Sequence, residues 1–429
     1  MGDDNRGSAS EPIRNCYSTF DYRSIILFYC WRCAIYLFVL CDPKKVSPTR
    51  RRHRQAMVVK PGWANMMFAR NSEPTPYRPR ALVLQWHITE RCNLRCAHCY
   101  QEAYAGKELS HRQLLDILGQ YVELLDSWRS RSLTPIFGHV TVTGGEPFAR
   151  RDFLGLLEVF AALKDRFSFA ILTNGTFIDA AVAGRLRDLG PRFVQVSIEG
   201  TETTHDGIRG PGTFERTVEA ITHLVAARVP ATISFTAHRK NFREFPEVAG
   251  LGRRLGVRRV WADRLIPSGS GEALGEQVLT PEETHEFFGL MLQARRDGRR
   301  RWFHKGTEVS MHRALQFMVG GGRPYQCGAG DSLITVQPNG DLYPCRRMPI
   351  PVGNLLEKPL SELYYSAELF QSLRDRDRVS TGCESCLHAD RCRGGLKCLS
   401  YAVTGDPFHA DPGCWQTSAS HAPCAPLPS

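Results

Sequence analysis

The chain has 429 residues, of which 42% are hydrophobic and 23% charged, as expected of a soluble protein with a large core and two or three domains. Its 15 cysteines form three groups and are absent from residues 100–326. This distribution excludes the disulfide framework of a small secreted domain and favours metal ligation in a reducing compartment. The net charge of +11 suits an acidic peptide, a phosphate-bearing ligand or nucleic acid without discriminating among them.

Residues 1–56 differ from everything that follows. An apolar run at 24–41 is interrupted by Arg32 and followed by a basic stretch. A membrane anchor of minimal length is one interpretation, although a central arginine is costly in a bilayer and no signal-peptide cleavage site is evident. We favour a disordered extension or a translation start at Met57, with residues 57–79 as a lead-in segment and a cytoplasmic location.

Six apolar, β-branched segments predict strands, and segments of helical periodicity separate them. The predicted strands are 82–88, 139–143, 167–172, 193–198, 232–237 and 259–265. The predicted helices are 110–128, 153–163, 180–189, 214–227 and 245–255. This alternation indicates an α/β fold of parallel β/α units, either an open sheet or a partial barrel. In both folds ligands gather at the carboxyl ends of the strands.

Three cysteines follow the first predicted strand in the sequence Cys92-Asn-Leu-Arg-Cys96-Ala-His-Cys99. Thiolates at this spacing can close a short loop around one metal centre. A [4Fe–4S] cluster normally takes four protein thiolates, so three would leave one iron open to a non-protein ligand, as a catalytic cluster needs. A structural zinc loop short of one ligand is the alternative interpretation.

Polar or glycine-rich turns are found at the other strand ends. They are Thr-Gly-Gly-Glu-Pro at 143–147, Thr-Asn-Gly at 173–175, Ser-Ile-Glu-Gly at 197–200 and, further on, Thr-His-Asp-Gly-Ile-Arg-Gly at 204–210. Successive glycines let the backbone approach a ligand closely, and a proline ends a turn sharply. Each turn alone has an ordinary interpretation as turn chemistry. Together with the cysteine loop, at one edge of the sheet, they predict a pocket for a polar small molecule.

As a set, the cysteine loop, the Gly-Gly-Glu-Pro turn and the Ser-x-Glu strand end resemble the radical S-adenosylmethionine (SAM) superfamily over about residues 80–270. The resemblance implies a partial (β/α)6 barrel whose open cluster iron binds the methionine amino and carboxylate groups of SAM. Reductive cleavage of SAM would then give methionine and a 5′-deoxyadenosyl radical that abstracts hydrogen. His98 stands where the family usually has an aromatic residue.

The same resemblance implies a set of cofactor-binding residues. Gly144, Gly145 and Glu146 would line the methionine amino group. The ribose or carboxylate contacts would come from Asn174, Ser197, Glu199 and Arg209. No residue can be named as a general acid or base. Asp263 and Arg264, at the end of the sixth predicted strand, either point into the substrate pocket or form a surface ion pair.

A second cysteine group occupies the C-terminal third, and on spacing alone its Cys-x-x-Cys pair suits one or two zinc sites. Behind a radical SAM barrel it resembles the SPASM extension, here over 321–416, after a helical linker at 271–320 and before a flexible tail at 417–429. This resemblance implies two auxiliary [4Fe–4S] clusters. The first would be bound by Cys327, Cys345 and Cys398, and the second by Cys383, Cys386, Cys392 and Cys414.

Two departures from the SPASM pattern concern the first auxiliary cluster. Five residues, rather than the usual three, separate Cys392 from Cys398, and no fourth cysteine closely follows Cys327. That cluster would therefore keep an open iron or take a non-cysteine ligand such as Asp331. Cys424 lies close to the end of the chain and is not expected to be a ligand.

The resemblance leads to a prediction of function. SPASM-type enzymes mostly modify ribosomally made peptides, so we expect a radical SAM oxidoreductase that crosslinks or matures such a peptide. The alternatives are side-chain processing of a haem or other tetrapyrrole, or other small-molecule radical chemistry, and a non-catalytic iron–sulfur or zinc protein. We expect an electron donor such as flavodoxin or ferredoxin, a possible separate leader-peptide-binding protein, and no nucleic acid.

Overall fold

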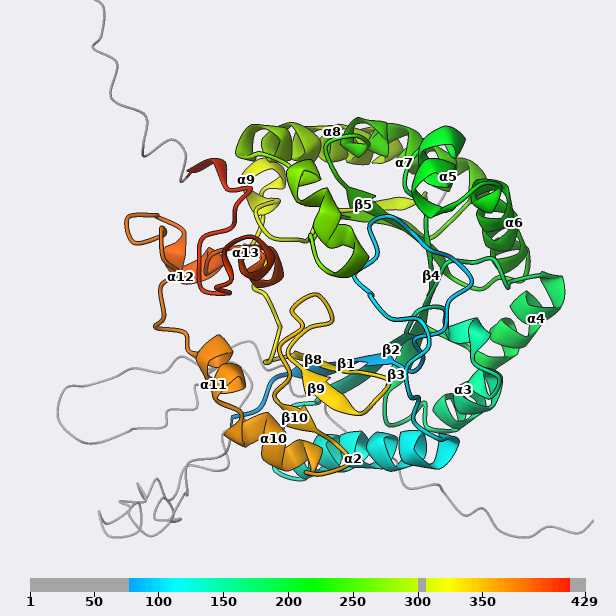
Figure 1. Ribbon diagram of the computed structural model, residues 1–429, viewed down its shortest axis with the longest axis vertical. Coiled ribbons are helices and arrows are strands. Elements are labelled where there is room, and N and C mark those ends of the chain that lie inside the picture. Colours follow the sequence, from blue (N-terminus) through cyan, green and yellow to red (C-terminus); the bar gives the residue numbers. More distant parts are fainter. Residues whose placement is uncertain (1–76, 300–305, 417–429) are drawn as a thin grey trace, which may run out of the picture. The chain divides into compact units, whose positions relative to one another are not determined.

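The structure is a computed structural model that describes residues 77–299 and 306–416 (Figure 1). The apolar run at 24–41, the alternative start at Met57 and the tail with Cys424 lie outside the described residues. In the described part of the chain, none of the helices has the length and apolar character needed to cross a membrane.

All six predicted strands are present, and each pairs in parallel with the next along the chain. They are β1 (Ala81–His87), β2 (Phe137–Thr143), β3 (Ser168–Thr173), β4 (Val194–Ser197), β5 (Ala231–Ala237) and β6 (Arg259–Arg264). Their central residues are buried, as expected for strands covered on both faces. The fold is therefore the predicted α/β partial barrel, and all six strands end at the same edge.

Helices cover the outer side of the curved sheet (Figure 1). They are α2 (His111–Arg129), α3 (Phe153–Ala162), α4 (Ala180–Leu189), α6 (Thr213–Ala226), α7 (Phe245–Leu255) and α8 (Pro281–Arg299). The Ser110 hydroxyl accepts a hydrogen bond from the Gln113 amide and caps α2, so the helix begins where the Ser-x-x-Gln pattern indicates. A further helix, α5 (Glu202–Arg209), forms in the segment that we expected to be a turn.

The sheet continues beyond the six predicted strands. On one side β7 (Glu308–Ser310) pairs in parallel with β6, and on the other β8 (Leu333–Val336) pairs in parallel with β1. Two short antiparallel strands, β9 (Asp341–Tyr343) and β10 (Gly353–Asn354), complete a ten-stranded sheet. The C-terminal third therefore joins the sheet next to β1, the strand that leads into the cysteine loop.

The remaining elements are short. The described linker range holds η4 (Gly269–Gln277), α8, β7 and α9 (Phe317–Gly320). Elsewhere in the described chain the 3₁₀ turns are η2 (Pro147–Ala149) and η3 (Phe242–Glu244). The C-terminal region contains α10 (Leu360–Ser366), α11 (Glu368–Arg374), α12 (Ala389–Cys392) and α13 (Lys397–Thr404). Helix α10 packs on α2, where the Trp128 indole donates a 2.7 Å hydrogen bond to the Tyr365 hydroxyl.

Candidate functional site

The three cysteines of the first group line one cavity at the carboxyl edge of the sheet. Cys92, Cys96 and Cys99 are free thiols in the loop after β1, and the cavity has a volume of about 160 Å³. Burial raises the pKa of the Cys92 thiol to about 11, and the neighbouring thiols add to this effect. A buried thiolate is stable only when a nearby cation compensates its charge, so a set of three neighbouring cysteines suits an iron–sulfur cluster.

Donor groups point at the sulfur atoms of this loop. The Leu94 amide and the Asn174 side-chain amide lie 3.4 and 3.9 Å from the Cys92 sulfur. Arg209 Nη1 lies 3.7 Å from the Cys96 sulfur. Hydrogen bonds to cluster sulfurs are a main means by which a protein sets the reduction potential of a cluster. The predicted residues Asn174 and Arg209 therefore contact the cysteine loop itself.

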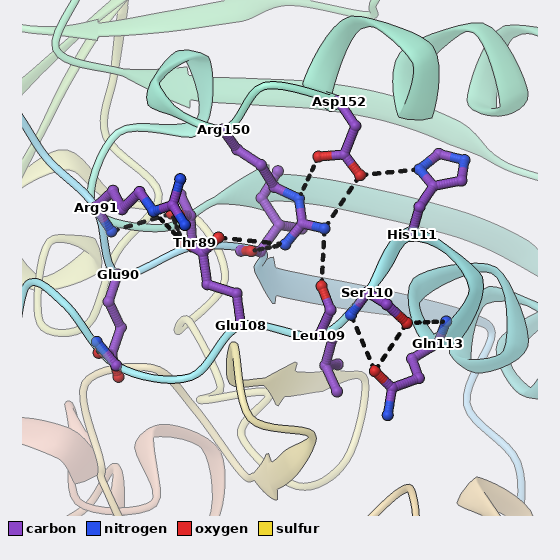
Figure 2. A network of polar contacts seen from close by, with 12 residues as sticks. Thr89, Glu90, Arg91, Glu108, Leu109, Ser110, His111, Gln113, Arg150 and Asp152 are labelled. Atoms are coloured by element: carbon purple, nitrogen blue, oxygen red, sulfur yellow. Dashed lines mark hydrogen bonds and ion pairs between the residues drawn. The ribbon is translucent and has the colours of Figure 1, made fainter.

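A buried arginine fixes both ends of that loop (Figure 2). Arg150 donates hydrogen bonds to the Ile88 carbonyl at the start of the loop (2.9 Å) and to the Leu109 carbonyl at its end (2.8 Å). Asp152 accepts hydrogen bonds from the same guanidinium through both carboxylate oxygens, at 2.7 and 3.1 Å. Because a single side chain contacts both ends, it holds the chain segment between them in one arrangement.

Carboxylates within the loop add further constraints (Figure 2). Glu108 accepts a short hydrogen bond from the Thr89 hydroxyl and lies 3.4 Å from Arg91. Glu90 accepts a 2.6 Å hydrogen bond from the Gly106 amide. The loop is therefore crosslinked across its width as well as held at its ends.

The predicted Gly144 and Gly145 pack directly against the beginning of the loop. The Gly145 amide donates a 2.9 Å hydrogen bond to the Thr89 carbonyl, and the next amide, of Glu146, donates to the Arg91 carbonyl at 2.8 Å. A Cβ atom at Gly145 would lie 2.5 Å from the same Arg91 oxygen, so no side chain fits there. Both glycines also line the cavity, which places unhindered backbone beside the cysteines.

Glu146 holds the end of β3 and does not line the cavity. Its fully buried carboxylate accepts hydrogen bonds from the Thr173 hydroxyl (2.8 Å) and from the Asn174 amide (2.7 Å). Burial raises its pKa to about 7 despite these donors. A direct contact of Glu146 with a ligand therefore stays a prediction, while its contacts show that it joins the β2 and β3 ends.

Asn174 and Ser197 are exposed to the cavity from neighbouring strand ends. The Asn174 side chain also donates a 2.9 Å hydrogen bond to Asn93, inside the cysteine loop. The Ser197 hydroxyl lies 3.3 Å from that of Ser234 on β5. Both side chains offer polar atoms where the sequence predicted a cofactor.

Glu199, Arg209 and His98 form a buried ionic cluster. Arg209 Nη2 lies 2.5 Å from one Glu199 oxygen, and His98 Nε2 lies 3.1 Å from the same oxygen. Burial disfavours the charged Glu199 carboxylate, but Arg209 and His98 outweigh it, so the pKa of Glu199 is well below its usual range. Of the three, Arg209 and His98 line the cavity. The cluster joins the cysteine loop to the β4 end and to α5.

Asp263 and Arg264 both line the cavity and each pairs with the C-terminal region, so they are not a surface pair. Arg347 Nη1 lies 2.7 Å from an Asp263 oxygen. Arg264 forms a bidentate pair with Asp411 at 2.7 and 2.6 Å, and both side chains of this pair are at most 2% exposed. The cavity is thus closed on one side by residues that come from both regions.

The C-terminal cysteines gather in two places. Cys383, Cys386, Cys392 and Cys414 line one small apolar cavity beside Asp411. Cys398 lies close enough to Cys345 and Cys327 for their thiolates to raise its pKa, in addition to the larger effect of burial. No group of His, Cys, Asp or Glu side chains within 77–299 and 306–416 is placed to hold a single metal ion.

Asp331 has a partner of its own. Its carboxylate accepts a short hydrogen bond from the Tyr77 hydroxyl, and its carbonyl accepts a 2.9 Å bond from the Tyr364 hydroxyl. Burial, followed by this hydrogen bond, raises the pKa of Tyr77 to about 12. A role for Asp331 as a cluster ligand therefore stays a prediction.

Several residues at the site were not predicted from the sequence. They are Arg150, Tyr100, Arg346, Arg347 and Asp411. Arg150 lies close behind the Gly-Gly-Glu-Pro turn, and the two adjacent arginines directly follow Cys345. Proximity to a recognised motif was the available signal, but arginines are common on surfaces and their burial is a tertiary property.

Comparisons with known proteins agree with the geometry. Residues 86–251 match the Radical SAM superfamily, and residues 327–387 match the iron–sulfur cluster-binding domain SPASM. The mycofactocin maturase of Mycolicibacterium smegmatis is 30% identical over 78% of this chain and 82% of its own length. The AdoMet-dependent heme synthase of Methanosarcina barkeri is 28% identical over 77% of this chain and 95% of its own length.

Two solved structures share the fold. The enzyme anSMEcpe, with bound AdoMet and the Cp18Cys peptide, superposes with a TM-score of 0.62 at 18% identity, over 79% of this chain and 95% of that chain. Streptococcus suis SuiB bound to S-adenosylmethionine superposes with a TM-score of 0.60 at 16% identity, over 78% of this chain and 77% of that chain. The SPASM match ends before Cys392, Cys398 and Cys414.

Proposed function

Because the chain belongs to the radical SAM superfamily and carries a SPASM domain, we propose that it matures a ribosomally synthesised peptide by oxidative radical chemistry. Its cofactors are SAM and a [4Fe–4S] cluster, together with auxiliary iron–sulfur clusters, and it is an enzyme of the SPASM type. The zinc and non-catalytic interpretations are set aside. Cys92, Cys96 and Cys99 would hold the first cluster, which when bound and reduced would supply the electron for cleavage of SAM to methionine and a hydrogen-abstracting radical.

The observation that carries this proposal is the shared cavity. One hollow is lined by the three thiols of the first group, by the polar ends of β2, β3 and β4, and by the C-terminal Arg346 and Arg347. We infer that Cys92, Cys96 and Cys99 hold the first cluster and that SAM contacts Gly144, Gly145, Asn174, Ser197 and Arg209. Glu146 and Glu199 would orient these groups from behind, through the hydrogen bonds and ion pairs described above.

The protein's part in the chemistry is binding and exclusion of water, because the hydrogen abstraction belongs to the cofactor. We infer that Cys383, Cys386, Cys392 and Cys414 hold one auxiliary cluster and that Cys327, Cys345 and Cys398 hold the other. An electron donor such as flavodoxin or ferredoxin would reduce the first cluster, and a separate leader-binding protein would deliver the peptide in the cytoplasm.

Several relatives and two solved folds support a peptide substrate. Mycofactocin maturases are among the relatives that reach 30% identity. The structure of anSMEcpe contains the Cp18Cys peptide together with AdoMet, and a further structure of SuiB contains its precursor peptide SuiA, so the shared fold accommodates a peptide in both proteins. The heme synthases of similar identity keep tetrapyrrole side-chain processing as the second candidate. It is favoured by Arg346, a cavity-lining arginine without a carboxylate partner among the described residues, because propionates are anionic.

Anaerobic reconstitution tests the proposal. The full chain, loaded with iron and sulfide and reduced with dithionite, should convert SAM to 5′-deoxyadenosine, and a peptide encoded beside the gene should gain a mass change in the same reaction. A Cys96→Ala variant should form no 5′-deoxyadenosine. Turnover of iron coproporphyrin but not of the peptide would overturn the peptide proposal, and unchanged activity in Cys96→Ala would overturn the assigned cluster site.

A further inference from the structure

Four arginines line the cavity that contains the first cysteine group, and three of them are neutralised by protein carboxylates. Arg209 pairs with Glu199, Arg264 with Asp411, and Arg347 with Asp263. The fourth, Arg346, forms no ion pair with any described residue. A guanidinium that is partly removed from water is costly unless a counter-charge is supplied, so this one differs in kind from the other three.

A tight turn places Arg346 and Arg347 side by side. The Met348 amide donates a 3.0 Å hydrogen bond to the Cys345 carbonyl, so the two arginines are the central residues of a four-residue turn. Both line the cavity, but Arg347 has Asp263 at 2.7 Å. Of the two arginines in this turn, Arg347 therefore has a carboxylate partner and Arg346 has none among the described residues.

The contacts of Arg346 are neutral. Its Nη1 donates a 3.2 Å hydrogen bond to the Tyr100 hydroxyl, and its guanidinium carbon lies 5.1 Å from the centre of the same ring. A phenol has an ordinary pKa of about 10, so the hydroxyl of Tyr100 is a neutral partner for this guanidinium. Burial, and then Arg346 itself, lowers the pKa of His87 to about 3, so this neighbour is also uncharged.

One donor of Arg346 has no acceptor. Its Nε is buried and has no hydrogen-bond partner in the described structure. Nε and one terminal nitrogen of a guanidinium form the fork that a carboxylate binds with two parallel hydrogen bonds. Tyr100 directly follows Cys99, so this fork lies beside the cysteine loop.

We propose that Arg346 binds a carboxylate of the substrate and so orients the substrate against the cysteine loop. The inference rests on the proposed function and narrows the substrate to a carboxylate-bearing molecule. The predicted SAM contacts come from the ends of β2, β3 and β4 and from α5, whereas Arg346 comes from the turn after β9. We therefore expect the carboxylate that Arg346 binds to belong to the substrate and not to SAM.

The test measures binding to the reconstituted full chain in the presence of saturating SAM, with butyrate and its neutral analogue butyramide as probes. We expect butyrate to bind and butyramide not to bind. Arg346→Gln should weaken butyrate binding at least about tenfold, because a charged hydrogen-bond pair is lost. Arg346→Lys should restore part of the affinity. Arg185→Gln, which alters an exposed ion pair with Glu158, is the matched control and should not change it.

Further measurements distinguish the molecules that could supply the carboxylate. If Arg346→Gln weakens SAM binding tenfold, or if SAM excludes butyrate, the guanidinium serves the cofactor and the proposal is wrong. An altered electron paramagnetic resonance spectrum of an auxiliary cluster, with butyrate affinity unchanged, also overturns it. Two further pairs of ligands identify the source of the carboxylate. They are the free-acid and amidated forms of the peptide encoded beside the gene, and iron coproporphyrin III and its tetramethyl ester. The source is the acid for which Arg346→Gln lowers the affinity.

This assay does not depend on turnover. A protein that binds butyrate through Arg346 but forms no 5′-deoxyadenosine would contradict the proposed function and leave the carboxylate site standing. Full SAM cleavage with equal affinity for butyrate and butyramide would contradict the carboxylate site and leave the proposed function standing.

Discussion

The cysteine loop after β1 and the cysteine cavity beside Asp411 both gather thiols, but they are held in different ways. In the first, three cysteines lie within residues 92–99 and the enclosing loop is bounded by β1 and α2, with Arg150 fixing both ends. In the second, four cysteines are spread over residues 383–414, where the regular elements are the short helices α12 and α13.

Asp411 compensates for the lack of regular structure in the second region. Besides Arg264, it binds the Leu396 amide and the Gly413 amide, each at 2.9 Å. One carboxylate thus fixes the chain on both sides of α13 and ties it to β6. The first site is thus held by contacts of several side chains, whereas in the second a single carboxylate joins three parts of the chain, and single substitutions should reveal this difference.

The largest effect is expected from Asp411→Asn. It leaves the buried Arg264 without a counter-charge, which should cost about 3–5 kcal/mol of unfolding free energy. The second cysteine cavity should lose its cluster, lowering the iron content by about four per chain. Urea unfolding of the apoprotein and iron analysis of the reconstituted protein measure the two effects.

Asp390→Asn is the matched control for that experiment, because its pair with Arg391 is 74% exposed on both sides. Such a change should alter stability by less than about 0.5 kcal/mol. Full iron content in Asp411→Asn would show that the ion pair does not hold the second region.

Arg150→Met should have the next largest effect. The Ile88 and Leu109 carbonyls lose a charged donor, which should cost about 2–4 kcal/mol. Only the first cluster should load poorly, so the electron paramagnetic resonance change that follows SAM addition should weaken while the auxiliary signals persist. Arg243→Met, at an exposed pair with Glu286, controls for the loss of an arginine. Equal loss of all clusters would contradict a local role.

Gly145→Ala tests the close approach of the β2 turn to the loop. A Cβ there would lie 2.5 Å from the Arg91 carbonyl oxygen, so the backbone must shift at a cost of about 1–3 kcal/mol. Gly155→Ala, in α3, meets nothing within 4 Å and should be neutral or stabilising by up to about 1 kcal/mol. Unfolding and SAM titration measure both variants, and equal behaviour of the two would count against the close contact.

The smallest effect at neutral pH is expected from His139→Gln in β2. Burial, with a further contribution from Arg192, lowers the pKa of His139 to about 4, against 6.5 in the unfolded chain. Its contribution to stability is present above pH 6.5 and is lost as the pH falls toward 4. The wild type should lose up to about 1.4 kcal/mol per pH unit relative to the variant in that window. Unfolding curves of wild type and variant measure this difference. An equal difference in unfolding free energy at pH 7 and pH 5 would contradict the lowered pKa of His139.

The sequence predicted the regular part of the barrel because periodicity is a local property. All six predicted strands and their helices appear close to their expected bounds. Strands β7 to β10, which have two to four residues, were missed because such short segments show little alternating pattern. Strand β4 also has four residues, but it was predicted as part of the longer apolar segment 193–198. The pairing of β7 to β10 depends on the edges of a sheet that only the folded chain provides.

The residues of the site likewise fall into those that local motifs predict and those that only the folded chain brings together. Cys92, Gly145 and Asn174 line one cavity, as their motifs predicted, because adjacent parallel strands end at one edge of the sheet. Motif matching did not separate the residues that line the cavity from Glu146, which supports the site from behind. Nor could it pair Arg264 with Asp411, which are 147 positions apart. Long-range pairs of charges leave no local pattern in a single sequence.

The parallel pairing of β8 with β1 also affects how the chain is made. Gln85 and Thr335 lie on these neighbouring strands but are 250 positions apart, so β1 keeps an open edge while the ribosome completes the chain. At roughly 5–20 residues per second, that interval lasts tens of seconds. An unpaired hydrophobic strand is prone to wrong association. Truncation before residue 333 would make this exposure permanent, so the barrel and the cysteine-rich region are best expressed as one chain.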